Sequence, residues 1–217
     1  MIPRFSFLGR QPFLATARLQ QLLRDRVVDG DLRSEIILGL EHDPVITFGR
    51  RACAEHLLVS SAELARRGIT VAEADRGGDV TYHGPGQLVV YPVMRLRRGI
   101  VAHVRALADA AISVAARFGV QAEFRRDCPG VWVGDRKLAS IGVHVHHGVA
   151  THGIALNLTT ALDNFTLIRA CGLDARPTSL SQLCGDRVSV DEAWQLFRAP
   201  LGYLCISART LSAPSLV

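Results

Sequence analysis

The chain has 217 residues, of which 48% are hydrophobic and 21% are charged, so it suits one domain, residues 1–217, with a substantial core. No apolar run approaches the roughly 18 residues of a transmembrane helix. The N-terminus also lacks the long apolar stretch and small-residue cleavage site of a signal peptide, so we expect a cytoplasmic protein without a membrane partner. The cysteines are odd in number and scattered, which favours reduced thiols over a disulfide framework: Cys53, Cys128, Cys171, Cys184 and Cys205.

The charge balance is basic and almost entirely due to arginine. The net charge is +5 and Lys137 is the only lysine, while the isoelectric point is near 9.3. A basic balance favours acidic partners, among which are acidic carrier proteins and nucleic acid. The arginines are dispersed and no aromatic platform accompanies them, so we expect no nucleic-acid partner. A solvated arginine-rich surface explains the charge as well as a binding patch does.

The first part of the chain predicts two helices and three strands. An amphipathic helix over residues 11–29 ends at Gly30 and carries apolar residues at roughly the helical period: Leu14, Leu19, Leu22, Leu23 and Val27. Buried strands follow at 36–40 and 45–50. A short helix begins at Ser60, which has Glu63 at capping-box spacing, and ends at Gly68. An apolar strand at 69–72 comes next.

The densest local signal is the segment 76–87, Arg-Gly-Gly-Asp-Val-Thr-Tyr-His-Gly-Pro-Gly-Gln. Its glycines and proline exclude a helix interior, and paired glycines let the backbone take φ > 0 and approach a ligand closely. We interpret it as a loop between the strand at 69–72 and a strand at 88–91 that ends at Pro92. A plain Gly-rich connection is the simpler explanation, but the side chains of Thr81, Tyr82 and His83 favour a binding surface.

The second part predicts a long helix over about 101–118 with Gly119 at its C-cap and a buried stripe of mostly small residues: Val104, Ala108, Ala111, Ala115 and Phe118. Strands at 131–133 and 137–145 form a hairpin about Gly134, and 149–158 returns as another strand. Beyond a segment with little periodicity at 160–177 come helices at 179–183 and 190–205 and a loosely held tail at 208–217. Strands clustered apart from helices predict an α+β fold around a mixed sheet.

Residue types alone give weak candidates for a nucleophile and a base. Cys171 precedes Gly172 in a loop that could present a reactive thiol, whereas Cys184 precedes a glycine at the end of a helical pattern, where a C-cap explains it. A thiol needs a nearby cation or base to become a thiolate. Lys137 could lose its proton where an arginine could not, although a solvated lysine at a hairpin end is the simpler explanation when that residue is considered alone.

The histidines leave further possibilities open. A zinc site could be drawn from clustered ligands, but the spacing matches no compact zinc pattern and we expect no metal: His144, His146, His147, His152 and Cys128. His83 could be an ordinary polar loop residue, a wall of a ligand pocket, or the partner of Cys171 in a protease-like pair. Backbone N–H groups near the glycines are natural donors to an oxyanion.

Four sequence blocks follow one another in a recognisable order. His-Asp-Pro-Val at 42–45 leads to Gly-Arg at 49–50, and the Gly-rich segment 76–87 continues into a leucine. Gly-Val-Trp-Val at 130–133 precedes Lys137, and His-Gly-Ile-Ala-Leu-Asn at 152–157 precedes the pair Cys171-Gly172. These blocks, within a catalytic core of about residues 34–186, resemble the octanoyltransferases of lipoate biosynthesis, also called lipoyl(octanoyl) transferases. Ala170 replaces the proline usual before the Cys-Gly pair.

The resemblance implies the biotin/lipoate protein ligase fold, a mixed sheet packed by helices. It implies transfer of an octanoyl group from octanoyl-acyl carrier protein to a lysine of lipoyl domains, those of 2-oxoacid dehydrogenases and the glycine cleavage H protein, as the first step of endogenous protein lipoylation. Cys171 would be the acyl-thioester nucleophile, and Lys137 would lower the pKa of that cysteine and shuttle protons, with neither ATP nor a metal. The implied substrate-binding walls are Arg76, Gly77, Gly78, Asp79, Val80, Thr81, Tyr82, His83, Ser140, Ile141, Gly142, Gly153, Ile154 and Ala155.

Two other functions are compatible with the chain. An ATP-using lipoate or biotin ligase of the same fold would need an adenylate-binding lysine and its own Gly-rich loop, and the Gly-Arg-Gly-Arg type of sequence of biotin ligases is absent. Dependence on ATP would distinguish it. A non-catalytic protein that binds acyl carriers or nucleic acid is the alternative from another class. A Cys171→Ala variant that loses transfer but keeps carrier binding would exclude it.

Overall fold

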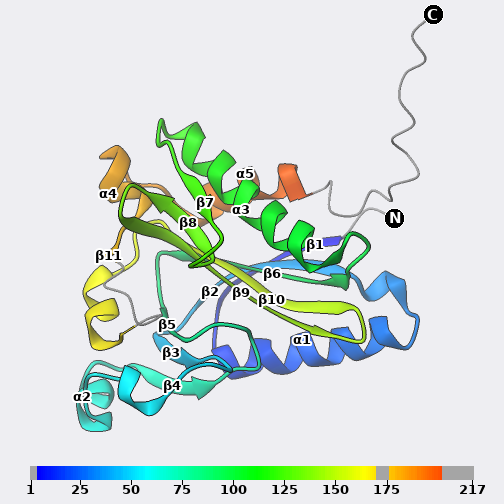
Figure 1. Ribbon diagram of the computed structural model, residues 1–217, viewed down its shortest axis with the longest axis horizontal. Helices are drawn as coiled ribbons and strands as arrows, with labels where there is room; N and C mark the ends of the chain where they lie inside the picture. Colours follow the sequence, from blue (N-terminus) through cyan, green and yellow to red (C-terminus); the bar gives the residue numbers. More distant parts are fainter. Residues whose placement is uncertain (1–3, 170–175, 202–217) are drawn as a thin grey trace, which may run out of the picture.

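The structure, a computed structural model, describes residues 4–169 and 176–201. Its elements form layers about one large β-sheet (Figure 1). Helices α3 (Gly99–Arg117) and α5 (Val190–Leu201) cover one face of this sheet. Helix α1 (Phe13–Val28) and a small second sheet lie on the other face. The predicted α+β class is confirmed.

The large sheet is mixed, in the order β1-β2-β6-β10-β9-β8-β7, with β11 paired to β9. β1 is parallel to β2 and β11 is parallel to β9, whereas the other neighbours are antiparallel. The predicted hairpin about Gly134 joins β8 to β9, and φ at this glycine is 57°. Strands β1 and β7 lie at the edges and were not predicted. The bounds are β1 (Arg4–Gln11), β2 (Ile36–His42), β6 (Gln87–Arg95), β7 (Glu123–Arg125), β8 (Gly130–Val133), β9 (Arg136–His146), β10 (Val149–Asn157) and β11 (Arg176–Pro177).

The small sheet has the order β4-β3-β5 and corrects the loop predicted over residues 76–87. β3 (Val45–Phe48) and β4 (Thr70–Glu73) match predicted strands, but Val80–His83 is itself a strand, β5, antiparallel to β3. The reason is burial, because Val80 and Tyr82 pack into a second core cluster beside Ile46. The Gly-rich loop is thereby limited to residues 76–79, with a separate turn at 84–86.

β6 continues through Pro92, where the sequence predicted its end. Proline lacks the N–H group that a sheet ladder requires. Across from it, the pairing of β6 with β10 is interrupted between residues 150 and 154. The N–H of His152, within this gap, donates to Oε1 of Gln20 in α1 at 2.7 Å. A helix side chain therefore accepts the backbone N–H of β10 where the strand ladder is interrupted.

Helix α1 packs against β6 and β10, and its predicted apolar stripe is confirmed in part. Val27 is fully buried, and Leu19 and Leu23 pack against a core cluster. Leu14 is 58% exposed and Leu22 is 66% exposed, whereas Thr16 and Gln20 are each 2% exposed. Thr16 Oγ1 donates to the carbonyl of Phe13 at 2.8 Å, and Gln20 binds the strand as described above. Hydrogen bonding therefore allows polar residues on the buried face, which an apolar pattern does not anticipate.

The main core lies between the large sheet and helices α3 and α5. The predicted stripe of α3 is confirmed at Ala108, Ala111 and Ala115, which are fully buried. Length and composition would allow α3 to cross a membrane, but its buried face packs against β9, β10 and α5, as in a core helix. The helix predicted over 190–205 is described as far as Leu201, and the predicted tail at 208–217 lies outside the described residues.

The shorter helices follow their predicted capping signals. Helix α2 (Ser61–Arg66) begins after Ser60, whose hydroxyl accepts the N–H of Glu63. Helix α4 (Leu180–Cys184) ends at Gly185, which has φ of 80°, so the C-cap interpretation of the Cys-Gly pair there is confirmed. The 3-10 helices within the connections are Leu32–Ser34, Ala54–His56 and Leu162–Leu167.

Candidate active site

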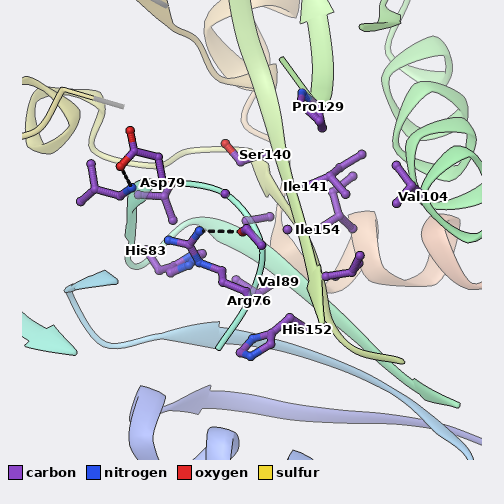
Figure 2. A pocket seen from close by; sticks show the side chains of 18 of the residues that line it. Arg76, Asp79, His83, Val89, Val104, Pro129, Ser140, Ile141, His152 and Ile154 are labelled. Carbon is purple, nitrogen blue, oxygen red and sulfur yellow. Dashed lines mark hydrogen bonds between the residues drawn. The ribbon is translucent and has the colours of Figure 1, made fainter. Parts of the chain in front are cut away.

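A cavity of about 650 Å³ lies between the Gly-rich loop and strands β6, β9 and β10 (Figure 2). This volume is within the range of small-molecule sites. The predicted wall residues that line it are Arg76, Gly77, Gly78, Asp79, Val80, Thr81, His83, Ser140, Ile141, Gly142, Gly153, Ile154 and Ala155. Tyr82 does not line it, because its ring packs in the second core cluster and its hydroxyl accepts from Nδ2 of Asn164 at 2.9 Å.

Close backbone contact holds the loop against β9. The N–H of Gly77 donates to the carbonyl of Val143 at 2.9 Å. A methyl group on Gly142 would lie only 2.8 Å from the carbonyl oxygen of Gly77, and Gly78 has φ of 91°. The positive φ predicted for this segment is confirmed at Gly78, and the close approach that the glycines allow is between the loop and β9. The Gly77 amide, however, is occupied by the sheet and does not serve as an oxyanion donor.

The charged side chains of the loop bind neighbouring elements. Arg76 is 8% exposed, and its Nη2 donates to the carbonyl of Thr47 on β3 at 2.7 Å and to the Thr47 hydroxyl at 2.8 Å. Asp79 Oδ1 accepts the N–H of Val80 at 2.7 Å and lies 2.6 Å from Nδ1 of His56. These contacts fix the shape of the cavity wall to which both residues contribute.

His83 ends a chain of side-chain hydrogen bonds whose directions follow from a backbone carbonyl. Asn157 Nδ2 donates to the carbonyl of Thr178 at 3.0 Å, so its Oδ1 accepts from Nε2 of Gln87 at 2.9 Å. Gln87 Oε1 then accepts from Nδ1 of His83 at 2.7 Å. This tautomer leaves Nε2 of His83 as an acceptor. Burial lowers the pKa of His83 well below its ordinary value, so the ring stays neutral.

Tyr91 adds a second neutral group to the cavity wall. Nδ1 of His42 donates to the carbonyl of Gln11 at 2.9 Å, which leaves Nε2 to accept the Tyr91 hydroxyl at 2.8 Å. Burial lowers the pKa of His42 to about 4 and raises that of Tyr91 above its ordinary value. Neither group carries charge at neutral pH.

His152 has an unusual backbone conformation, with φ of 57°. Figure 2 shows its ring on the same side of the sheet as Arg76, whereas Ile154 and Val104 lie on the other side. Nε2 of His152 lies 2.6 Å from Oδ1 of Asp75. The hydrogen bond from His152 is the main reason that the pKa of Asp75 falls to about 2. His152, a residue other than glycine with a left-handed backbone conformation, therefore lies at the cavity. Backbone strain of this kind is often found at functional sites.

Lys137 reaches the cavity because β9 contains a β-bulge. Val131 is in register with Ala139 and Trp132 with Lys137, so Leu138 has no partner in β8. Leu138 and Ala139 consequently both enter the main core, while Lys137 lines the cavity. Its Nζ lies 3.5 Å from the Sγ of Cys128 and 5.4 Å from the centre of the Trp132 ring.

Cys171, the predicted nucleophile, lies outside the described residues. Cys53, Cys128 and Cys184 are free thiols, as the sequence predicts. Within residues 4–169 and 176–201, no group of three or more His, Cys, Asp or Glu side chains is arranged to hold a metal ion.

Several cavity residues were not predicted as wall residues, and some of them have a sequence signal. Val89 and Tyr91 alternate along β6, and His152 directly precedes the predicted Gly153. The further lining residues are Arg50, Arg51, Ile100, Val104, Pro129, Val143, Asn157, Phe165 and Pro177. The side chains from separate strands and from α3 meet only through the tertiary fold.

Comparison with known proteins agrees with this fold. Residues 11–201 match the model of the lipoyl protein ligase A/B catalytic domain. An octanoyltransferase of Solibacter usitatus is 44% identical over 193 residues, which cover 88% of this chain and 87% of the relative. An octanoyltransferase of Maridesulfovibrio salexigens is 42% identical over 202 residues, which cover 91% of this chain and 94% of the relative.

Solved structures with the same fold are more distant in sequence. Lipoate-protein ligase A bound with ATP has a TM-score of 0.74 at 19% identity, covering 94% of this chain and 85% of that one. A bipartite lipoate protein ligase from Thermoplasma acidophilum was solved in a study of that ligase and its E2 lipoyl domain. It has a TM-score of 0.73 at 19% identity, covering 94% of this chain and 84% of that one. The chain belongs to the lipoyl protein ligase A/B catalytic domain family and, within it, to the octanoyltransferases. It is thus an acyltransferase that transfers octanoyl groups in protein lipoylation.

Proposed function

We propose that the chain transfers an octanoyl group from octanoyl-acyl carrier protein to a lysine of lipoyl domains through a thioester on Cys171, without ATP or a metal. The observation that carries this proposal is the position of Lys137, the only lysine, in the wall of the 650 Å³ cavity. An amine beside such a cavity can favour a nearby thiolate and accept or return a proton.

The described residues on both sides of the Cys171 segment support its assignment. On one side, the N–H of Arg169 donates to the carbonyl of His56 at 2.8 Å, and His56 in turn contacts Asp79 of the cavity wall. On the other side, Pro177 of β11 is in register with Lys137. Arg169 and Pro177, the described residues on either side, are thus linked to walls of the same cavity.

In the first half-reaction, the Cys171 thiolate attacks the thioester carbonyl of the loaded carrier. The bond from the carbonyl carbon to the carrier sulfur breaks, and Lys137 gives its proton to the departing thiolate of the carrier. In the second half-reaction, the acceptor lysine attacks acyl-Cys171, an amide bond forms and the Cys171 thiolate leaves. Lys137 takes the proton that the amine releases. ATP has no role in this sequence, because the thioester is already activated.

Part of the cavity wall suits a linear acyl chain. His83 and Tyr91 are neutral wall residues, and His42, which accepts the Tyr91 hydroxyl, is neutral as well. Val89 and Ile154 add apolar side chains to the wall. Neutral and apolar groups of this kind can enclose a chain that carries no charge without stranding an ion beside it.

The partners in this proposal are proteins that carry the octanoyl donor and the lysine acceptor. The net charge of +5 favours encounter with acidic carriers and acidic lipoyl domains. The solved relative from Thermoplasma acidophilum, which was studied with its E2 lipoyl domain, supports a lipoyl domain as the acceptor. The unpaired cysteines are compatible with a reducing compartment such as the cytoplasm.

The test is transfer from octanoyl-acyl carrier protein to a purified lipoyl domain, followed by the mass of the acceptor. We expect the mass to rise by one octanoyl group without ATP, and Lys137→Ala to lose most of this activity. Lys137→Arg keeps a charge but cannot donate and recover a proton at neutral pH, so it should also be impaired. Transfer that requires ATP and free octanoate would instead favour the ligase function.

A further inference from the structure

Cys128 supplies the hydrogen bond that Lys137 makes through its amine. Sγ of Cys128 lies 3.5 Å from Nζ, and no acidic side chain within residues 4–169 and 176–201 forms a salt bridge with this lysine. Cys128 is 5% exposed and does not itself line the cavity. The thiol therefore contacts the amine from behind the cavity wall.

The surroundings hold both partners in place. The carbonyl of Cys128 accepts Nε1–H of Trp132 at 3.2 Å, and Nζ of Lys137 lies over the same ring. The lysine stem passes so close to Gly130 that a methyl group there would lie 2.7 Å from its Cε. The Lys137 carbonyl accepts the N–H of Thr178 at 3.0 Å. The amine, stem and backbone of Lys137 are each restrained by a different neighbour.

We propose that Cys128 is a positioning residue for the transferase reaction, whose thiol holds the Lys137 amine at the cavity. This inference rests on the role of Lys137 in the proposed function. A carboxylate at this place would bind a charged amine strongly, whereas sulfur is a weak acceptor. The thiol thus fixes the direction of the amine while leaving its proton free to be transferred. Cys128 itself forms no bond to the acyl group.

The experiment compares Cys128→Ala and Cys128→Ser with the unchanged protein. For octanoyl transfer, we expect Cys128→Ala to lower kcat about three- to tenfold, which is the range for one lost hydrogen bond, and to leave KM unchanged. The serine hydroxyl also accepts a hydrogen bond, so Cys128→Ser should recover much of kcat. Cys184→Ala, at a free thiol outside the cavity lining, is the matched control and should behave like the unchanged protein.

A second measurement does not depend on transfer. Because Lys137 is the only lysine, an amine-reactive reagent followed by fragment mapping reports on its amine separately from the N-terminal amine. Lys137 should be labelled severalfold faster in Cys128→Ala than in the unchanged protein or in Cys128→Ser. Equal labelling rates in all three would overturn the proposal, as would octanoyl found on Cys128. If the unchanged protein transfers no octanoyl, the proposed function fails, and the labelling rates still decide whether Cys128 holds the amine.

Discussion

Two buried histidines contribute to the way in which this protein responds to acid. Burial lowers the pKa of His42 and of His103 to about 4, from 6.5. His42 has hydrogen-bond partners on both ring nitrogens, whereas Nε2 of His103 has none among the described residues. In the unfolded chain both rings bind a proton near pH 6.5, but in the folded protein they resist doing so. The stability that they contribute is therefore complete above pH 6.5 and is lost as the pH falls toward 4.

His103→Leu isolates this effect away from the cavity. At pH 4 protonation of His103 stabilises the unfolded state by about 3 kcal/mol more than the folded state, and this difference destabilises the protein. Leucine cannot be protonated, so the variant lacks this loss of stability. We therefore expect the variant to gain stability relative to the unchanged protein when the pH is lowered from 7 to 4. Its free energy of unfolding, minus that of the unchanged protein, should be larger at pH 4 than at pH 7 by that amount. Urea unfolding at both pH values measures it, with the exposed His146→Leu as control. An equal difference at both pH values would contradict the assignment.

His152 is held in a backbone conformation that few side chains tolerate. A β-branched residue is strained in the left-handed region by about 1–2 kcal/mol, whereas asparagine enters it more easily. His152→Val should therefore be less stable than His152→Asn in urea unfolding, although both lose the histidine contact with Asp75. If the two variants unfold at the same urea concentration, φ at this position does not contribute to stability.

At the scale of elements, the site depends on the contact between the Gly-rich loop and β9. Gly142→Ala places a methyl group 2.8 Å from the Gly77 carbonyl and should displace the loop. A misplacement near 1 Å can lower the rate of an enzyme by roughly a hundredfold, and we expect a loss of this order. Val145→Ala, on the same strand but outside the cavity lining, removes atoms without crowding the loop and is the control. Unchanged transfer by Gly142→Ala would show that the loop tolerates displacement.

The elements also show which features a sequence can predict. The order of strands and helices, the capping at Ser60 and the motifs at the Gly-rich loop and Lys137 follow from local patterns, and the structure confirms where these elements lie. The strand at 80–83 was missed because its residues were interpreted as loop side chains, and only packing against Ile46 shows otherwise. β6 continues through Pro92 because the residues beyond it pair with β2 and β10, which are distant in sequence. The placement of Tyr91 and His152 at one cavity likewise needs the tertiary fold.

At the scale of the whole molecule, the net charge of +5 should act on encounter with acidic partners. Salt screens interactions between exposed charges over about 10 Å at 0.1 M ionic strength. Raising the ionic strength should lower kcat/KM for the loaded carrier severalfold while changing kcat much less, because kcat reports the chemistry of groups that are already bound at the cavity. Steady-state rates across a salt series provide the measurement. A kcat/KM that does not vary with salt would show that the charge has no part in carrier encounter.

The most direct test of the account is the intact mass of the protein after mixing with octanoyl-acyl carrier protein in the absence of ATP, followed by fragment mapping. We predict a single octanoyl adduct on Cys171 that hydroxylamine removes and that a lipoyl domain accepts. An adduct on another cysteine, or transfer to the lipoyl domain with no adduct on the enzyme at any time, would contradict the proposed thioester on Cys171.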